Sequence, residues 1–337
     1  MRVFLTGGTG LVGSHVAEQL IARGHSVRGL VRERSDVAHL AAIGTELVRG
    51  DMTTSLGALS ELMRGCDAIV HAAALVGARA TREQYVEQNV DGTRTVLSAA
   101  AAAGIDRAIH VSSVAVYGTI DGLIGEARWQ EQIMSERAFY AWSKRAAEIE
   151  AWRHHDDGSL RVTTVRPALV YGERDRHVSA RLDRLLRLPL LPLVDGGRHS
   201  APLVYAGNVA RAIVAALHVD GAVGRAYNVA IDHALPLRTF VQMWCAAAGR
   251  RPPLMPALPG AALEGAARIV DYLSARAPGI DLPGLTRPAR LLRTNNPYDS
   301  SRARDELGWH DVVPADEAIK RTVAWLKMRD APRASDS

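Results

Sequence analysis

Apolar residues recur along the first half of the chain in two alternating patterns. Short continuous apolar runs predict buried strands, and apolar residues at helical spacing between them predict amphipathic helices. The predicted strands span residues 3–5, 27–31, 46–48, 68–70, 108–111 and 162–165. The predicted helices span residues 11–23, 36–42, 56–63, 82–103 and 138–154. This alternation indicates βαβ units with right-handed crossovers, and therefore an α/β fold with a doubly wound parallel sheet.

Prolines interrupt the second half of the chain. Strand-like runs return at residues 203–205 and 226–229 with a helix at 209–218 between them, and we expect all three to join the sheet domain. We therefore assign residues 1–170 and about 202–229 to a dinucleotide-binding domain. Residues from about 171–201 and 230–328 are assigned to a smaller, mostly helical C-terminal lobe that binds substrate. The tail at 329–337 is small and polar and is expected to be flexible.

Composition excludes several classes of partner. The chain of 337 residues is 47% hydrophobic and 23% charged, as in an ordinary globular protein. Its net charge of +5 comes from cations scattered along the chain, 38 of 41 of them arginine, so no nucleic-acid partner is expected. Neither a signal peptide nor an apolar stretch of roughly 18 residues occurs, which predicts a cytoplasmic protein without a membrane anchor. The two distant thiols Cys66 and Cys245 predict no metal site.

A glycine-rich turn joins the first predicted strand to the first predicted helix. Glycines at 7, 10 and 13 give the spacing G-x-x-G-x-x-G. The first permits a tight turn, the second lets the backbone approach a pyrophosphate, and the third lets helix and strand pack closely. Backbone N–H groups at the helix N-terminus then face the anion. A flexible glycine loop is the alternative, but this strand–turn–helix context predicts a Rossmann-type dinucleotide site. Its residues are Gly7, Thr9, Gly10, Leu11, Val12 and Gly13.

The end of the second predicted strand indicates which dinucleotide binds. An NAD site usually places a carboxylate there, on the ribose 2′-hydroxyl. This chain has Val31 and Arg32 instead, followed by Arg34 and Ser35. A guanidinium can bind a 2′-phosphate through two hydrogen bonds, whereas a carboxylate would repel it. We therefore expect NADP(H) to be preferred, with NAD(H) possible; solvated loop arginines are the alternative.

A second group of residues suggests redox chemistry at a carbonyl. Tyr140 and Lys144 form a Y-x-x-x-K pair on a predicted helix, so both side chains lie on one face. A nearby ammonium favours the phenolate form of a tyrosine. Ser112 and Ser113 end a predicted strand at the carboxyl edge of the sheet, where ligands of α/β proteins bind. A hydroxyl there could orient a substrate carbonyl for hydride attack.

These motifs, taken in order, resemble the extended short-chain dehydrogenase/reductase superfamily, also called the NAD-dependent epimerase/dehydratase family. The resemblance covers nearly the whole chain. It is carried by Gly7/Gly10/Gly13, Gly50-Asp51-Met52, His71 to Ala74, Asn89 to Thr93, Ser112-Ser113, Val116-Tyr117-Gly118, Tyr140/Lys144, Arg166-Pro167, Val170-Tyr171-Gly172 and Leu307-Gly308-Trp309.

The resemblance implies roles for individual residues. Tyr140 would be the acid/base, Lys144 would contact the nicotinamide ribose, and Ser113 would contact the substrate. Further cofactor contacts would come from Asp51 and Met52 near adenine, Ala72, Ala73, Ala74 and Leu75 along the cofactor, Asn89 near the ribose, and Ser112, Pro167 and Val170. Taken singly, several of these residues also have structural explanations: Asp51 as a turn residue, Asn89 as a polar group inside a helix and His71 as a core histidine. The resemblance also implies a homodimer through the helices at 82–103 and 138–154.

Within this superfamily, two differences from the sugar-nucleotide enzymes argue against a nucleotide-sugar substrate. Ala201-Pro202 stands where many sugar-nucleotide enzymes carry Arg-Asp-Tyr/Phe, and Pro167-Ala168-Leu169 replaces a frequent Asn. The run from Val204 to Ala210 and the proline-interrupted apolar stretch 252–273, with 285–287 after it, resemble the 3β-hydroxysteroid dehydrogenase-like and 3-oxoalkanoate reductase branches. We therefore expect an NAD(P)-dependent ketoreductase or hydroxy-dehydrogenase acting on an apolar small molecule, although that stretch could simply be lobe core. The alternatives are a nucleotide-sugar 4-epimerase or 4,6-dehydratase with tightly bound NAD, and a non-catalytic NAD(P) sensor. The sequence leaves the substrate and the direction of hydride transfer open.

Overall fold

The computed structural model describes residues 1–76, 80–118, 124–126, 138–175, 178–230, 232–274, 293, 295–310 and 312–330. The chain divides into two compact units. The first comprises Met1–Val170, Ala206–Ala230 and Tyr298–Val312. The second comprises Tyr171–Tyr205, Ile231–Pro297 and Val313–Ser337.

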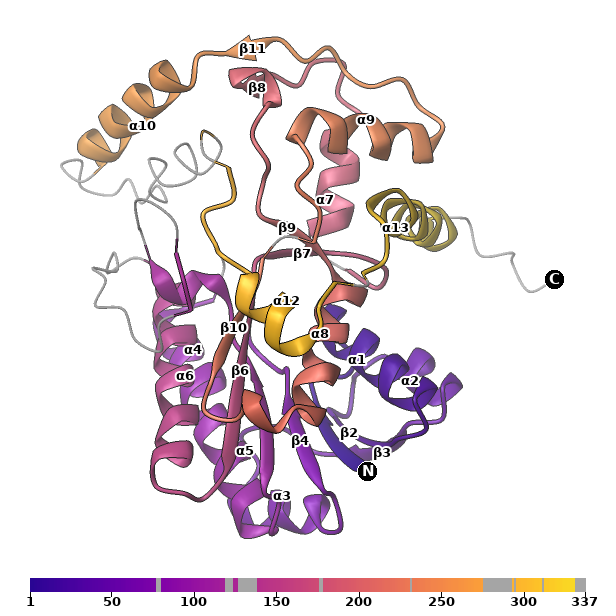
Figure 1. Cartoon of the computed structure of the whole chain (residues 1–337), viewed down its shortest axis with the longest axis vertical. Helices are drawn as coiled ribbons and strands as arrows, with labels where there is room; N and C mark the ends of the chain where they lie inside the picture. The colour runs from indigo at the N-terminus through magenta and orange to yellow at the C-terminus, as the bar shows by residue number, and fades with distance from the viewer. Residues whose placement is uncertain are drawn as a thin grey trace. The chain divides into compact units, whose positions relative to one another are not determined.

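A seven-stranded sheet forms the centre of the first unit (Figure 1). Its strand order is β10-β6-β5-β4-β1-β2-β3, and every neighbouring pair is parallel. The strands are β1 (Arg2–Thr6), β2 (Ser26–Val31), β3 (Glu46–Arg49), β4 (Ala68–His71), β5 (Arg107–Val111), β6 (Arg161–Pro167) and β10 (Ala226–Val229). From β1 the chain adds strands first on one side (β2, β3) and then on the other (β4, β5, β6, β10). The point between β1 and β4 where the strand order reverses is where doubly wound sheets bind dinucleotides. The predicted α/β fold is confirmed.

Helices cover both faces of this sheet (Figure 1). On one face α1 (Leu11–Ala22) packs against α8 (Ala206–His218). On the other face α3 (Leu56–Met63), α5 (Gly92–Ala102) and α6 (Phe139–Asp156) pack side by side. The short helix α2 (Ala38–Ala42) follows β2. Strand residues such as Phe4 and Ile69 pack with Leu59, Val96 and Trp152 in one buried apolar cluster, which joins the sheet to the second set of helices.

The single helix predicted over residues 82–103 has three parts. It begins as α4 (Arg82–Tyr85), passes through a π-helical turn, η1 (Val86–Asp91), and continues as α5. Thr81 caps the start in a capping box with Gln84. Apolar periodicity does not reveal the π-turn, because one widened turn leaves the rest of the pattern nearly unchanged. The turn contains Asn89, whose contacts are described below.

Residues 298–312 were expected in the C-terminal lobe, but they belong to the first unit. The helix α12 (Ser301–Leu307) lies in this segment. Glu306 accepts a hydrogen bond from the Tyr227 hydroxyl at 2.7 Å, and Trp309 Nε1 donates to the Asn208 carbonyl at 2.8 Å. These long-range contacts hold a late segment in the sheet unit. Conversely, β9 (Leu203–Tyr205) lies outside the seven-stranded sheet and in the second unit.

The second unit is mostly helical. Its helices are α7 (Val178–Leu185), α9 (Leu237–Ala248), α10 (Gly260–Ser274) and α13 (Ala315–Asp330). The chain enters this unit within β7 (Leu169–Tyr171), and β8 (Leu193–Val194) pairs with β11 (Ala257–Leu258). An apolar cluster of residues that includes Tyr171, Phe240, Trp244 and Val323 forms its core. Residues 331–337 of the predicted tail lie outside the described residues, as do residues 285–287, which follow the apolar stretch.

No described helix is both long and apolar enough to span a bilayer.

Candidate functional site

The glycine turn after β1 requires glycine at its first and third positions. Gly7 has φ +72°, and a Cβ there would lie 2.6–2.8 Å from the backbone of Ala72 and Ala73. At Gly13 a Cβ would lie 2.2 Å from the Gly7 carbonyl oxygen. Both positions are too close to neighbouring backbone for a side chain. The turn therefore keeps β1, β4 and the start of α1 in close contact.

The N-terminus of α1 is open to an anion. Gly10 is its N-cap residue, no side chain caps the helix, and its first turn carries no acidic residue. Uncapped backbone N–H groups and the partial positive charge of the helix start are what a pyrophosphate requires. Together with the close-packed glycines, this arrangement fits a dinucleotide. Val12 and Gly13 lie within this first turn, and Gly13 packs beneath the glycine turn.

An open groove of about 760 Å³, solvent-facing space included, runs along the carboxyl ends of β1, β2, β3 and β4. Ten predicted cofactor residues line it: Gly7, Thr9, Gly10, Arg32, Ser35, Asp51, Met52, Ala72, Ala73 and Ala74. Leu75, also expected along the cofactor, lines it as well. The prediction missed four lining residues: Thr6, Leu30, Gly50 and Gln88. Thr6, Gly50 and Gln88 are immediate neighbours of Gly7, Asp51 and Asn89, so proximity to a motif was the available signal.

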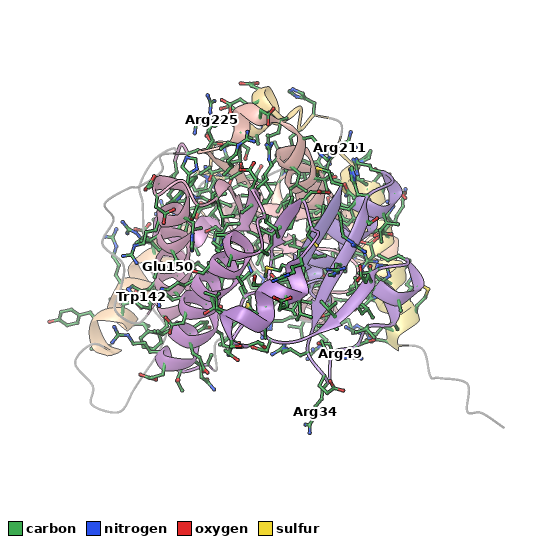
Figure 2. All side chains as sticks on the ribbon, turned by 90° about the horizontal axis from the view of Figure 1, so that it is seen from below. Arg34, Arg49, Trp142, Glu150, Arg211 and Arg225 are labelled. Carbon is green, nitrogen blue, oxygen red and sulfur yellow. The ribbon has the colours of Figure 1, made fainter. Side chains whose placement is uncertain are left out.

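Arg32 and Arg49 lie at one end of this groove, where β2 and β3 end. Arg32 lines the groove with a side chain that is 74% exposed, and its Nε lies 3.9 Å from an Asp51 carboxylate oxygen. Arg49, which the sequence analysis did not single out, donates at 3.1 Å to the carbonyls of both Arg32 and Glu33. It therefore braces the loop that carries Arg32. Arg34 reaches away from the fold at the tip of this loop and does not line the groove (Figure 2).

Asp51 is a turn residue that also lines the groove. One of its carboxylate oxygens accepts hydrogen bonds from the Thr53 backbone N–H at 3.0 Å and from the Thr53 hydroxyl at 3.1 Å. Its own backbone N–H donates to the Thr54 hydroxyl at 3.0 Å. These bonds form a turn that presents Asp51 and Met52 to the groove.

Asn89 connects the groove to α6 from inside the π-helical turn. Its amide oxygen accepts the Leu75 N–H at 2.6 Å, and its amide nitrogen donates to the Leu75 carbonyl at 3.1 Å. The same nitrogen donates to the Ser143 hydroxyl at 3.0 Å. Asn89 therefore fixes the Leu75 backbone beside the residue that precedes Lys144. It does not line the groove itself.

His71 is a satisfied core histidine. Its Nδ1 and the Thr6 hydroxyl are 2.7 Å apart, and its Nε2 lies 3.0 Å from the Thr93 hydroxyl. Because the Thr93 hydroxyl donates to the Asn89 carbonyl at 2.6 Å, Nε2 carries the proton and donates to Thr93. Burial, together with the charge of Lys144, lowers the pKa of His71 to about 3. His71 is therefore neutral and structural.

The structure brings Ser113 and Tyr140 together. Ser113 follows β5 and caps the 3₁₀ helix η2 (Val114–Tyr117), its hydroxyl accepting the Ala115 N–H at 3.1 Å. Tyr140 is the second residue of α6. Burial raises the pKa of the Tyr140 phenol, whereas a hydrogen bond with the Ser113 side chain lowers it. The phenol therefore holds its proton at neutral pH, as a proton donor must.

Lys144 lies one helical turn after Tyr140 and is buried. Its ammonium donates to the Val111 carbonyl at the end of β5 at 2.8 Å. Burial lowers the pKa of Lys144 to about 8, and the negative charge of Glu148 opposes that effect. Part of the ammonium population can therefore lose its proton slightly above neutral pH. The local charge around Lys144 consequently decides how much of the enzyme carries the cation.

Four further predicted cofactor residues occupy places outside the groove. The Ser112 hydroxyl donates to Glu148 at 2.6 Å, so it is engaged inside the fold. Pro167 ends β6 and pairs in register with Val229. Val170 is half-buried in β7. Leu11 starts α1 and, like Ser112, Pro167 and Val170, does not line the groove.

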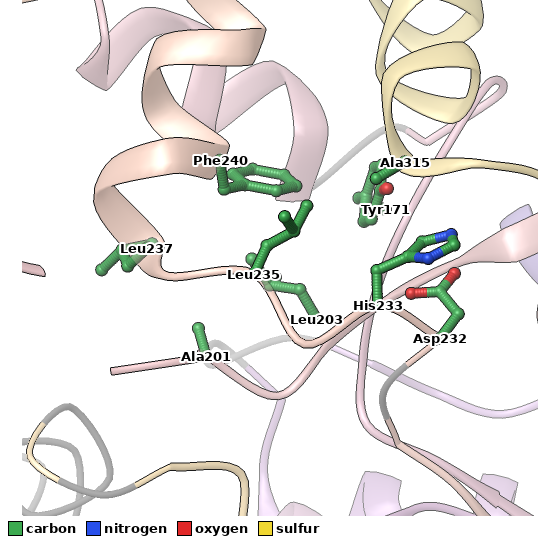
Figure 3. Close-up of a pocket in the computed structure, with 9 residues that line it drawn as sticks. All are labelled: Tyr171, Ala201, Leu203, Asp232, His233, Leu235, Leu237, Phe240 and Ala315. Carbon is green, nitrogen blue, oxygen red and sulfur yellow. The ribbon is translucent and has the colours of Figure 1, made fainter. Parts of the chain in front are cut away.

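A smaller pocket lies within the second unit (Figure 3). Its lining is mainly apolar: Tyr171, Ala201, Leu203, Leu235, Leu237, Phe240 and Ala315, with Asp232 and His233 at one side. Asp232 accepts the Tyr205 N–H at 3.0 Å, and the His233 ring is hydrogen-bonded to the Val313 carbonyl at 2.8 Å. Both polar groups therefore have structural partners. No cluster of three or more metal-ligating side chains occurs among the residues that the structure describes.

Comparison with known proteins agrees with this site. The family model for the NAD dependent epimerase/dehydratase family matches residues 3–230. A ketoreductase of Stigmatella aurantiaca, named for 4-hydroxy-2-methyl-3-oxo-4-farnesyl-3,4-dihydroquinoline-1-oxide, is 32% identical over 321 residues, 95% of each protein. A 2-alkyl-3-oxoalkanoate reductase of Stenotrophomonas maltophilia is 31% identical over 337 residues, 96% of this chain and 99% of the relative. The crystal structure of gox2253 matches with a TM-score of 0.79 and 28% identity, covering 98% of each chain.

The prediction of an oxidoreductase is thereby confirmed, and the cofactor prediction is supported only as far as dependence on a nicotinamide dinucleotide. The relatives are named as reductases, which supports an NAD(P)-dependent oxidoreductase. The family description supports dependence on NAD, without deciding between NAD and NADP. On its family match and on relatives that share its full length, the chain belongs to the NAD dependent epimerase/dehydratase family.

Proposed function

We propose that this protein is a ketoreductase that uses Ser113, Tyr140 and Lys144 to reduce a ketone. The observation that supports this most directly is the buried Lys144 ammonium, which donates to the Val111 carbonyl at the end of β5, just before Ser112 and Ser113, and lies one helical turn after Tyr140. All three lie at the carboxyl edge of the sheet that also carries the groove. This arrangement supplies a hydroxyl to orient a carbonyl, a phenol to protonate it and a cation one helical turn along α6 from the phenol.

Each side chain has a defined task in this reaction. A nicotinamide dinucleotide bound in the groove supplies the hydride. The Ser113 hydroxyl orients the substrate oxygen and stabilises the negative charge that develops there. The Tyr140 phenol donates its proton to that oxygen, so its high pKa suits the reductive direction. The Lys144 ammonium binds the nicotinamide ribose and favours the phenolate that remains after proton transfer.

NADPH is the proposed reductant. Arg32 and Ser35 line the groove at the end of β2, and Arg49 braces their loop. A guanidinium at this position offers a 2′-phosphate charge-assisted hydrogen bonds. The ratio of kcat/KM for NADPH to that for NADH measures this preference. A ratio below one would contradict it.

The proposed substrate is a ketone that carries an apolar group. The names of the two relatives specify a farnesyl group in one case and alkyl chains in the other. A panel of 3-oxo acids, steroids, cyclic ketones and nucleotide sugars, followed by NADPH oxidation at 340 nm, identifies the class. Tightly held NAD in the purified protein, together with turnover of a nucleotide sugar, would favour the epimerase alternative.

Tyr140→Phe tests the catalytic assignment. This change removes the proton donor and keeps the ring, so turnover should fall by about 10²–10⁴-fold while the Kd for NADPH stays within about twofold. Tyr227→Phe is the matched control, because it also removes one buried hydroxyl hydrogen bond, in this case to Glu306. The control should keep its kcat. Full activity in Tyr140→Phe would refute the proposed function.

We also propose a homodimer, formed through α5 and α6 as the family resemblance implies. Light scattering on the purified chain measures its molar mass against the 36.3 kDa of one chain. A monomeric mass across the concentration range of the activity assays would exclude the dimer.

A further inference from the structure

A buried ion pair lies beneath the proposed catalytic residues. The side chains of Glu148 and Arg166 are each 2% exposed, and the Arg166 Nε lies 3.1 Å from both carboxylate oxygens of Glu148. Arg166 Nη2 donates a further hydrogen bond to the same carboxylate. Glu148 also accepts hydrogen bonds from the Ser112 hydroxyl at 2.6 Å and from Trp152 Nε1 at 3.0 Å. Each of the two carboxylate oxygens of Glu148 therefore accepts at least two hydrogen bonds.

The arginine of this pair continues the network toward β10. Arg166 Nη1 donates to the Tyr117 hydroxyl at 2.7 Å, and its guanidinium lies 5.0 Å from the centroid of the Tyr117 ring. The Tyr117 hydroxyl donates onward to the Asn228 amide oxygen at 2.7 Å. Tyr117 is 2% exposed and Asn228 is fully buried. The network thus joins α6, β5, η2, β6 and β10.

The network holds residues on both sides of Ser113 and a residue on the helix of Tyr140 and Lys144. Ser112 and Tyr117 lie on either side of Ser113, so the ion pair holds both ends of the short segment that carries the substrate-orienting hydroxyl. Glu148 is one helical turn beyond Lys144 and two beyond Tyr140 on α6. One ion pair therefore connects the segment of Ser113 to the helix of Tyr140 and Lys144.

Stability alone is a poor explanation for such a pair. Removing two charges from water costs about as much as their attraction returns, and an apolar pair of similar volume is often as stable. What a buried pair can supply is a unique geometry, because each of its hydrogen bonds has a fixed direction. We propose that Glu148 and Arg166 are positioning residues, which set Ser113 against Tyr140 and place a negative charge beneath the Lys144 ammonium. This inference rests on the proposed function.

The charges around Lys144 support the second part of this role. Burial lowers the pKa of Lys144 to about 8, and Glu148 is the carboxylate that opposes it. Among the described residues, the titratable groups that face Lys144 include His71 on β4 and His110 on β5, and burial lowers the pKa of both, so they are neutral at pH 7. Tyr140 lies one helical turn before Lys144 on α6, and burial keeps its phenol protonated and neutral. Arg166 on β6 is a cation. Without the negative charge of Glu148, burial would favour the neutral amine of Lys144 more strongly, and its pKa would be lower still.

Glu148→Gln tests both parts of the role in the full-length enzyme. The amide keeps the size and loses the charge. We expect kcat to fall on the order of 10²-fold, as for a small misplacement of reacting groups, with the KM for NADPH changed less than about threefold. The alkaline limb of kcat/KM should also move to lower pH by about one unit, because Lys144 loses its opposing charge.

Glu150→Gln is the matched control. Glu150 lies on the same helix and is 6% exposed, and it pairs with Arg94 and Arg153 rather than with the network. This variant should keep both the kcat and the pH profile. Equal losses in Glu148→Gln and Glu150→Gln would show a general effect on α6 and would overturn the proposal.

Tyr117→Phe and Ser112→Ala separate positioning from charge. Each removes one hydrogen bond between the ion pair and the segment of Ser113, and neither changes a charge. We expect kcat to fall about three- to tenfold in each, in line with the loss of roughly 0.5–1.5 kcal/mol per hydrogen bond, without a shift of the alkaline limb. These variants also decide the matter if Glu148→Gln does not fold. If both are folded and keep their kcat within twofold, the positioning role is refuted.

Failure of this inference is distinguishable from failure of the proposed function. An inactive Tyr140→Phe together with a Glu148→Gln enzyme of unchanged kcat and pH profile overturns only the role of the ion pair. An active Tyr140→Phe overturns the proposed function.

Discussion

Gly13→Ala is a sharp test of the glycine turn, because two effects of the same methyl group oppose each other. Gly13 is the third residue of α1, where alanine is the better helix former by about 1 kcal/mol. The new Cβ, however, would lie 2.2 Å from the Gly7 carbonyl oxygen, 2.7 Å from the Gly7 carbonyl carbon and 3.0 Å from the Gly8 Cα. All three are backbone atoms, so no side-chain rotation relieves the overlap.

The magnitude follows from these distances. An ordinary carbon–oxygen contact is about 3.3 Å, so helix and turn must separate by about 1 Å. Overpacking of this kind costs about 1–3 kcal/mol, which outweighs the gain in helix propensity. The displaced backbone is the part of the groove at which we propose that a pyrophosphate binds. We therefore expect a net loss of about 1 kcal/mol in the free energy of unfolding and at least a tenfold increase in the Kd for NADPH.

Gly57→Ala is the matched control for this experiment. Gly57 is the second residue of α3, is exposed, and a Cβ there would meet no atom within 4 Å. This variant should gain up to about 1 kcal/mol and bind NADPH like the wild type. Denaturant unfolding and fluorescence titration with NADPH measure both quantities. If Gly13→Ala binds NADPH within twofold and is as stable as Gly57→Ala, the close-packing argument is wrong.

Three further outcomes are expected. His110→Leu should stabilise the protein by about 1 kcal/mol in urea unfolding, because it removes two buried ring nitrogens without partners, whereas His71→Leu should destabilise it through the loss of two hydrogen bonds. Folding lowers the pKa of His110, so below about pH 6.5 the unfolded chain binds a proton at this residue that the folded protein does not, and the wild type becomes less stable as the pH falls. His110→Leu should therefore lose less stability than the wild type between pH 8 and pH 5. An equal loss in both proteins would contradict this. Arg32→Asp should lower the ratio of kcat/KM for NADPH to that for NADH by roughly 10- to 100-fold, and Arg34→Asp by much less, because only Arg32 lines the groove; equal effects would refute this assignment.

The sequence was sufficient wherever function depends on neighbours along the chain. Gly7, Gly10 and Gly13 could be interpreted because a turn and the helix that follows it are local, and the packing distances at Gly7 and Gly13 now show why glycine is needed. Tyr140 and Lys144 could be paired because helical spacing places them on one face. The alternation of strands and helices likewise predicted the doubly wound sheet, which is confirmed.

Residues from distant segments were harder to assign. Arg49 has no motif of its own, and its role depends on the pairing of β2 with β3, which brings it beside the carbonyls of residues 32 and 33. Ser112 and Ser113 are adjacent hydroxyls in the sequence, but the first donates to Glu148 inside the fold, whereas the second accepts the Ala115 N–H and lowers the pKa of the Tyr140 phenol. Only the alternation of side chains about the end of β5 separates them.

The amino-acid sequence by itself therefore determined the fold class, the glycine turn and the spacing of the proposed catalytic pair, because each depends on spacing within one element or between consecutive elements. Tertiary structure alone decided which buried charges lie next to the helix that carries this pair. Glu148 lies on α6, Arg166 lies on β6, and Asn228 lies 62 positions beyond Arg166 on β10. Parallel pairing sets Arg166 beside Asn228, and the packing of α6 against β6 brings Glu148 to Arg166. Hydrogen-bond direction and burial are properties of that three-dimensional contact, and no periodicity along the chain encodes them.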